Sequence, residues 1–373
     1  MNKKITLIVI CLILVLGGVS LVKNKNTKNQ EPIKLGFVGP LTGDASSYGE
    51  PTKAGVEIAV EKINQAGGIN GRMIEVIYED GKCSGKDATA AAQKLLSVDK
   101  VKFIIGGVCS SETLAIAPLT EPLKAILFSP VSSSSKVTTA GDYVFRNQAS
   151  DLYIGDVLAK KIIESHKTVA IISESTDYAQ SIEKVFSEVY KSSGGQIVFN
   201  ETFQSGVKDF KSEALKIIST NPEAIYINAQ SSSSFIQIMK SLKINNNTAQ
   251  VYSVFLSGPE VLETGDLVEG VIIADLPNLA NSQEVKDLLA KHQEKYGKAP
   301  SYPNFTGTGY DAIQIISKGI EKYGEDTSKI KDYIYTIKNY KGTAGEYSFD
   351  ENGDIQGIEY LFRKIESGKL INL

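Results

Sequence analysis

Several residue types that build catalytic and metal sites are scarce in this chain of 373 residues. Tryptophan is absent, and His166 and His292 stand alone, so no histidine pair is available to hold a metal. The three cysteines form no Cys-x-x-Cys pair, which excludes the usual zinc and thiol-redox motifs. The chain also lacks the Gly-x-Ser-x-Gly elbow of serine hydrolases. These absences predict a protein that is not an enzyme and needs no metal or cofactor.

Positive charge is not in excess either. Lysine and arginine number 40 against 43 aspartates and glutamates, which gives a net charge of −3. Proteins that bind nucleic acid present a basic face to the phosphates, so nucleic acid is not an expected partner. Hydrophobic residues make up 42% and charged residues 22% of the chain, an ordinary globular composition. The length predicts two domains.

The N-terminus is typical of an exported protein. Met1-Asn2-Lys3-Lys4 is basic, and residues 5–22 carry no charge and end near the small residues Gly18-Val19-Ser20. Residues 1–22 therefore read as a signal peptide, or alternatively as an uncleaved membrane anchor. Residues 23–32 are polar and aperiodic, as in a tether. We expect a periplasmic or cell-surface protein, tethered to the membrane if the apolar segment is retained.

Export affects how the remaining cysteines are interpreted. Outside the cytoplasm two thiols normally pair, so Cys83 and Cys109 are expected to form a disulfide. In the chain-entropy model such a loop stabilises the fold by about 3.5 kcal/mol. The alternative is two free buried thiols.

Strand and helix patterns alternate from Pro32 onward, in one series up to Ser129 and a second from Asp151. This alternation predicts an α/β fold with two doubly wound lobes, each a parallel sheet covered by helices on both faces. A hairpin over 343–364 is expected to end the chain. Ligands of such sheets bind outside the carboxyl ends of the strands. Two lobes that face each other across those ends would form a ligand cleft that closes by a hinge movement.

One strand end points to an anionic ligand. The apolar run 101–105 and Gly106-Gly107 lead into Cys109-Ser110-Ser111, where a helical pattern begins. A helix N-terminus presents free N–H groups and the positive end of the helix dipole, so it binds carboxylates and phosphates. Taken alone, the serines indicate only a helix cap. Their place at the carboxyl end of a strand favours ligand binding.

Several short motifs occur in a fixed order along the chain: 35–43, 66–71, Asp80 with Cys83, 104–111 and 129–133. Together they resemble the leucine/isoleucine/valine-binding family, the amino-acid receptors of ABC importers. The likeness covers 33 to about 364 and implies a type I periplasmic-binding fold with three hinge crossings, near 147–151, 276–279 and 346–350. It implies a first lobe of 33–148 plus 278–346 and a second of 149–277 plus 347–373.

The same resemblance implies a set of ligand-binding residues. Ser110 is similar to the family serine that binds the ligand carboxylate through its hydroxyl and N–H, and Ser111 shares that helix end. The carbonyl of Val131 is similar to one that accepts from the ligand ammonium, and Ser133 to a hydroxyl at the polar end of the ligand. Ser134 and Ser135 are expected to be solvated. The remaining matches are Tyr48 and Tyr178, which would close over the ligand, Gln230, and Asp151 at the first hinge, where capping of the next helix is the alternative.

One position departs from the family pattern. Family members usually offset the ammonium with an acidic residue after a strand of the second lobe. Spacing places Phe255 there, whereas the motif Gly258-Pro259-Glu260 would place Glu260. Burying an unpaired ammonium is costly. Phe255 in the cleft would therefore favour an aromatic or aliphatic acid, or an amide, and Glu260 an amino acid.

The resemblance implies an extracytoplasmic, monomeric solute receptor of an ABC importer. Its ligand would be a small carboxylate, an amino acid first of all, and its partners the permease subunits in the membrane. A membrane-tethered sensory domain is the alternative function.

Overall fold

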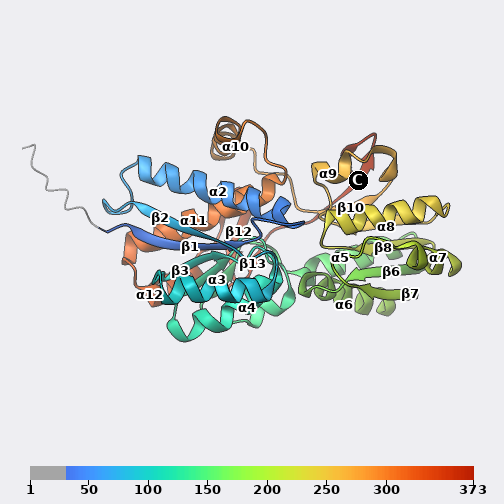
Figure 1. Cartoon of the computed structure of the whole chain (residues 1–373), viewed down its shortest axis with the longest axis horizontal. Coiled ribbons are helices and arrows are strands. Elements are labelled where there is room, and N and C mark those ends of the chain that lie inside the picture. Colours follow the sequence, from blue (N-terminus) through green and yellow to red (C-terminus); the bar gives the residue numbers. More distant parts are fainter. Residues whose placement is uncertain (1–30) are drawn as a thin grey trace, which may run out of the picture.

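Two sheets, each with helices on both faces, form two lobes side by side in the computed structural model, which describes residues 31–373 (Figure 1). The predicted signal peptide or anchor at 1–22 lies outside the described residues, as does the predicted tether up to residue 30. Among residues 31–373, no helix combines the length and the apolar character that a membrane span requires.

The first lobe is built on a parallel five-stranded sheet in the order β2-β1-β3-β4-β5. Helices α2 and α11 cover one face, and α3 and α4 the other (Figure 1). The inner strands β3 and β4 are buried throughout, as a sheet covered on both faces requires. The elements are β1 (Ile33–Gly39), β2 (Ile74–Asp80), β3 (Phe103–Gly106), β4 (Ile126–Ser129), β5 (Val144–Arg146), α2 (Ser46–Gln65), α3 (Gly85–Ser97), α4 (Ser110–Thr120), α10 (Gln283–Tyr296), α11 (Pro303–Tyr323) and α12 (Thr327–Tyr335).

The second lobe is built on a seven-stranded sheet in the order β15-β14-β10-β9-β8-β6-β7. The strands β6 to β10 are parallel, and β14 and β15 add to the edge antiparallel. The elements are β6 (Thr168–Glu174), β7 (Gln196–Phe203), β8 (Ala224–Asn228), β9 (Gln250–Val254), β10 (Ile272–Asp275), β14 (Leu361–Glu366), β15 (Lys369–Asn372), α5 (Asp151–Ile163), α6 (Asp177–Ser192), α7 (Lys211–Ser219), α8 (Ser232–Ile244) and α9 (Pro259–Leu262). These two sheets confirm the predicted α/β fold.

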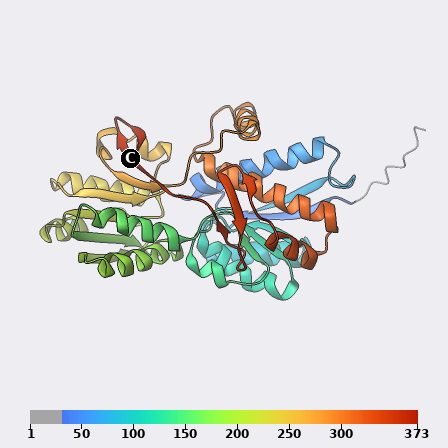
Figure 2. The ribbon, with the colours of Figure 1, turned by 180° about the vertical axis from the view of Figure 1, so that it is seen from behind.

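The predicted C-terminal hairpin forms around its turn at 350–354, but its second strand is short and residues 361–364 do not belong to it. The strand β12 (Gly345–Phe349) pairs with β11 (Tyr340–Gly342) and with β13 (Ile355–Gln356), in a small antiparallel sheet on the first lobe. The chain then crosses to the second lobe, where β14 pairs with β10 (Figure 2). Alternating apolar residues show that both segments are strands, but they do not reveal which neighbour each strand meets.

Two glycines let α2 and α11 approach closely. A Cβ on Gly55 of α2 would overlap the carbonyl oxygen of Thr306, and one on Gly309 of α11 would overlap that of Thr52. This contact fixes the start of α2, which carries Tyr48, against the start of α11, which carries Phe305. Two segments more than 250 residues apart thereby meet at the edge of the interlobe cavity described below.

Candidate ligand-binding site

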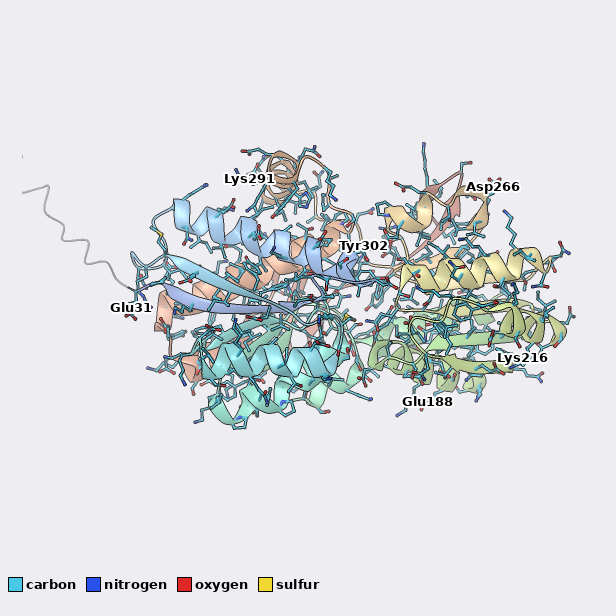
Figure 3. All side chains as sticks on the ribbon, in the orientation of Figure 1. Glu31, Glu188, Lys216, Asp266, Lys291 and Tyr302 are labelled. Atoms are coloured by element: carbon cyan, nitrogen blue, oxygen red, sulfur yellow. A yellow bond between two sulfur atoms is a disulfide. The ribbon has the colours of Figure 1, made fainter. Side chains whose placement is uncertain are left out.

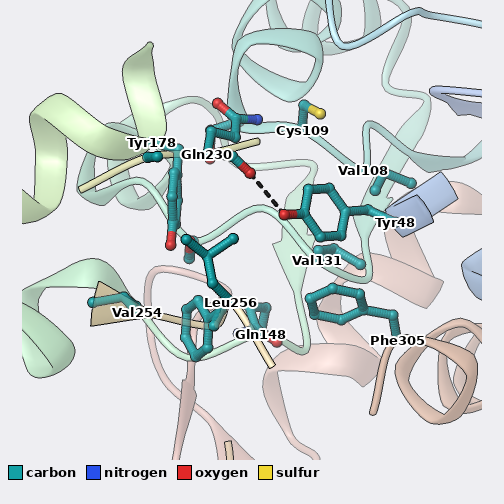
Figure 4. Close-up of a pocket in the computed structure, with 14 residues that line it drawn as sticks. Tyr48, Val108, Cys109, Val131, Gln148, Tyr178, Gln230, Val254, Leu256 and Phe305 are labelled. Atoms are coloured by element: carbon teal, nitrogen blue, oxygen red, sulfur yellow. Dashed lines mark hydrogen bonds between the residues drawn. The ribbon is translucent and has the colours of Figure 1, made fainter. Parts of the chain in front are cut away.

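A cavity lies between the lobes, at the carboxyl ends of strands from both sheets (Figure 4). With its mouth it encloses about 490 Å³ free of protein atoms. None of its lining side chains carries a formal charge at neutral pH. The first lobe contributes Tyr48, Val108, Cys109, Ser110, Val131, Ser133 and Phe305; the second contributes Tyr178, Ala229, Gln230, Val254, Phe255 and Leu256; and Gln148 lies in the crossing between β5 and α5.

The polar end of the cavity is the N-terminus of α4. The helix begins at Ser110 after an extended Cys109, and the Glu112 carboxylate accepts the N–H of Cys109 at 2.9 Å. Among residues 31–373, the N–H groups of Ser110 and Ser111 meet no acceptor. The Ser110 hydroxyl accepts the N–H of Ser134 at 3.1 Å, which leaves its own proton free to donate. The helix end therefore offers an oriented hydroxyl donor beside free first-turn N–H groups.

The predicted disulfide holds this end in place, because Cys83 and Cys109 are bonded with their Cα atoms 5.2 Å apart. The pairing is confirmed. Glu112 also accepts the N–H of Cys83 at 2.9 Å, so one carboxylate holds the backbone of both cysteines. Burial raises the pKa of Glu112 to about 7, although these backbone donors favour its ionised form.

Hydrogen bonds attach the loop after β4 to the same end. The carbonyl of Gly107 accepts from the hydroxyls of Thr113, Ser129 and Ser132 at 2.7–3.0 Å. Ser134 is fully buried and donates to Ser110, so the expectation that it is solvated is wrong. The N–H of Ser135 donates a hydrogen bond to the hydroxyl of Ser181 in the second lobe, at 2.8 Å. A serine-rich stretch can be a solvated loop or a buried network, and only the fold decides which.

Asp151 lies behind the cavity wall at the start of α5. Its N–H donates to the carbonyl of Ser133 at 2.8 Å, and its carboxylate oxygens are buried without a hydrogen-bond partner among residues 31–373. Burial raises the pKa of Asp151 to about 7, although the nearby Arg146 charge and the Ser133 and Ser181 hydroxyls, which lie close without forming a hydrogen bond to the carboxylate, favour its ionised form. Ser150 caps the helix, accepting from Leu152, so the Asp151 carboxylate is not the cap.

Aromatic and amide side chains join the lobes across the cavity. The Tyr48 hydroxyl donates to the backbone carbonyl of Gln230 at 2.7 Å (Figure 4). The Gln230 side-chain amide donates to Cys83 Sγ at 2.9 Å. The Tyr48 ring contacts Tyr302 and Phe305 edge-on. Burial raises the pKa of both Tyr48 and Tyr178, so both hydroxyls are protonated donors at neutral pH.

Phe255 and Glu260, the two candidates for the position where family members usually have an acidic residue, lie in different places. Phe255 lines the cavity. Glu260 does not, because its carboxylate accepts from the hydroxyls of Tyr302 at 2.9 Å and Ser232 at 2.8 Å. Tyr302 lies where the two lobes meet (Figure 3). Ser111 also lies outside the lining, and its hydroxyl donates to the carbonyl of Cys83 at 3.0 Å.

Sequence reasoning missed several lining residues. Phe305 belongs to α11, about 200 residues beyond the helix end at Ser110, and no motif marks it. Val254 and Leu256 flank Phe255, and Gln148 lies within a predicted hinge crossing, so these three could have been included from their positions alone.

Comparison with known proteins gives a family and close structural matches. Residues 32–367 match the periplasmic binding protein family. By sequence the chain is similar to the leucine-, isoleucine-, valine-, threonine- and alanine-binding protein of Pseudomonas aeruginosa strain PAO1, with 28% identity over 340 residues, 88% of this chain and 89% of that protein.

By structure it is similar to the leucine-binding protein LivK of Thermotoga maritima, with a TM-score of 0.84, 28% identity, and coverage of 91% of this chain and 97% of that one. It is also similar to the branched-chain amino acid transporter substrate-binding protein LivJ of Streptococcus pneumoniae in complex with isoleucine. That match has a TM-score of 0.81, 25% identity, and coverage of 92% and 100%.

Proposed function

This chain belongs to the periplasmic binding protein family, of the branched-chain amino acid type, and we propose that it captures a small carboxylate ligand between its lobes for an ABC importer. One observation carries the proposal. The N-terminus of α4, with its free first-turn N–H groups and the Ser110 hydroxyl, opens into a cavity whose lining is otherwise uncharged. A single carboxylate fits there, because the helix end offsets about half a unit charge.

Contacts between the lobes support capture by hinge closure. Tyr48 bonds Gln230 and Tyr302 bonds Glu260, each joining the first lobe to the second. At the rim, Lys136 pairs with Asp177 at 2.6 Å, but both side chains are partly solvated, so this ion pair contributes little. Closing the lobes on a ligand would exclude water and strengthen its polar contacts. We place two hinge crossings at the predicted segments near 147–151 and 276–279. We place the third at 357–360, between β13 and β14, and not near 346–350 as the resemblance implied, because β12 and β13 still belong to the first lobe.

An amino acid is the first ligand class that we propose, since relatives are named for amino acids. Its ammonium would meet the Val131 carbonyl and the Ser133 hydroxyl, with Asp151 behind them. An ammonium at that place would favour the ionised form of Asp151 and lower its pKa.

A carboxylic acid without an amine is the second class. Phe255, which spacing aligns with the family's usual acid, lines the cavity, and Glu260, which the motif aligns with it, is engaged elsewhere. An ammonium beside the Phe255 ring would have no carboxylate facing it from the cavity wall. This arrangement favours an apolar or aromatic body on the ligand.

A thermal-shift screen tests the proposal. Ligand-free protein, refolded with its disulfide intact, is mixed with apolar amino acids, aliphatic and aromatic acids, and the primary amides of each. We expect acids of one class to raise the melting temperature by mass action, with amides giving little shift. Thermal shifts given only by acids with an α-amine would identify an amino acid as the ligand. Thermal shifts given equally by acids without an amine would identify a carboxylic acid of the second class. A panel with no response, or equal shifts with the amides, would contradict carboxylate capture.

Delivery and location follow from the same proposal. The closed lobes would present the ligand to permease subunits in the membrane, and the protein would act outside the cytoplasm as a monomer. The sensory alternative would use the same cavity without delivery.

A further inference from the structure

The interlobe cavity is not the only space beside Phe255. A second cavity lies next to the crossing between β10 and α10, and with its mouth it encloses about 1320 Å³ free of protein atoms. Phe255 and Phe305 line both cavities. Two aromatic rings therefore stand between the ligand cavity and this second space, which we call the hinge cavity.

The hinge cavity has a mixed lining: apolar side chains could hold a hydrocarbon group, and polar side chains, among them Asp275, Asn278 and Asn304, stand beside them. Its walls include Leu276, Leu279, Leu370 and Ile371. Its one guanidinium, on Arg363, is already engaged with Asp275 at 2.6 Å and with Asn278 at 2.7 Å. A second anionic group would thus find no free positive charge there, whereas a hydrocarbon tail would find leucine and isoleucine side chains.

Phe255 is held in an unusual backbone conformation. Its φ is +56°, in the left-handed region that glycine and asparagine tolerate and bulky residues seldom adopt. Its N–H donates to the carbonyl of Ala274 at 3.0 Å, and its ring packs against Tyr360 with centroids 5.8 Å apart. Strain of this kind persists where the surrounding structure requires the conformation, and it clusters at ligand sites.

We propose that Phe255 is a specificity-determining residue that closes the ligand cavity and limits the length of the ligand. Cys109 and Ser110 line the ligand cavity from the first lobe, whereas Phe255 lines it from the second. A ligand whose carboxylate sits at Ser110 therefore extends its body toward the Phe255 ring. The ring stops the body there, and without it the ligand cavity would open toward the hinge cavity beside the Phe305 ring, which remains. This inference rests on the proposed function.

Length-graded ligands test the proposal. Two probe series are titrated by calorimetry: straight-chain carboxylates of about four to ten carbons, and 2-amino acids with the same chain lengths. Phe255→Gly removes the ring and suits the left-handed backbone, and Phe255→Asn is a second variant that tolerates it. Phe255→Tyr keeps the ring and is the matched control.

In the wild type and in Phe255→Tyr, we expect affinity to fall sharply beyond a limiting chain length. In Phe255→Gly and Phe255→Asn, the limiting chain length should increase by at least two carbons. The ratio of the affinity for the longest bound ligand to that for the shortest should rise about tenfold or more. An unchanged limit in variants that still bind the short members would overturn the role of Phe255 alone. A wild type that binds neither series would overturn this inference, and the proposed function falls with it only if the aromatic acids of the thermal-shift panel also give no response.

Discussion

Ser110→Ala is expected to weaken binding of the carboxylate ligand by about 10- to 150-fold. The Ser110 hydroxyl accepts the N–H of Ser134, so its proton is free for the ligand. A hydrogen bond to a charged group contributes about 1.5–3 kcal/mol, which corresponds to that loss of affinity. Calorimetric titration of the acid that gives the largest thermal shift would measure the effect.

Ser111→Ala is the matched control for that variant. The Ser111 hydroxyl lies on the same helix end but donates to the carbonyl of Cys83, outside the cavity lining. Its loss should change affinity less than about threefold, since no ligand contact is removed. An unchanged affinity in Ser110→Ala, or a greater loss in Ser111→Ala, would show that the carboxylate does not dock on the Ser110 hydroxyl.

Gly55→Ala is expected to lower the free energy of unfolding by about 2–3 kcal/mol, as overpacking of a close contact does. The new Cβ would overlap the backbone of Thr306, so α2 and α11 must separate. That shift also moves Tyr48 away from Phe305, whose rings lie 5.8 Å apart at the cavity. Urea unfolding would measure the stability, and titration of the same acid should show weaker binding.

Gly319→Ala on α11 provides the comparison. The nearest atoms to its Cβ would be side-chain atoms of Ile330 and Tyr333 and no backbone atom, and alanine favours a helix by about 1 kcal/mol over glycine. We expect a smaller loss of stability and no loss of affinity. Equal destabilisation by the two variants would mean that the backbone contact at Gly55 has no special role.

Local pattern was enough to predict part of this molecule. The strand, glycines and serines around Ser110 predict a helix N-terminus, and the structure has a helix beginning at that residue. Export and two cysteines predict a disulfide, and Cys83 and Cys109 are bonded. Both predictions succeed because each depends on residues close in sequence or on a strong chemical preference.

Other features of the fold and of the site depend on contacts between distant segments, and the local sequence pattern could not predict them. Phe305 lines the cavity because glycines bring α11 against α2, and neither helix alone reveals that approach. Ser134 is buried where the loop after β4 packs against the start of α4, and its N–H donates to the Ser110 hydroxyl there. The strand β14 joins β10, since its alternating pattern fits any open sheet edge. The left-handed backbone of Phe255 likewise has no signal in its own side chain.

Calorimetric titration of ligand-free protein with one acid and with its primary amide would test carboxylate docking at α4 most directly. The two probes have almost the same shape, but only the acid carries the negative charge that the helix end and the Ser110 hydroxyl would bind. We expect the acid to bind at least about 30-fold more tightly than the amide, or roughly 2 kcal/mol. Equal affinities would contradict an anion site at the N-terminus of α4.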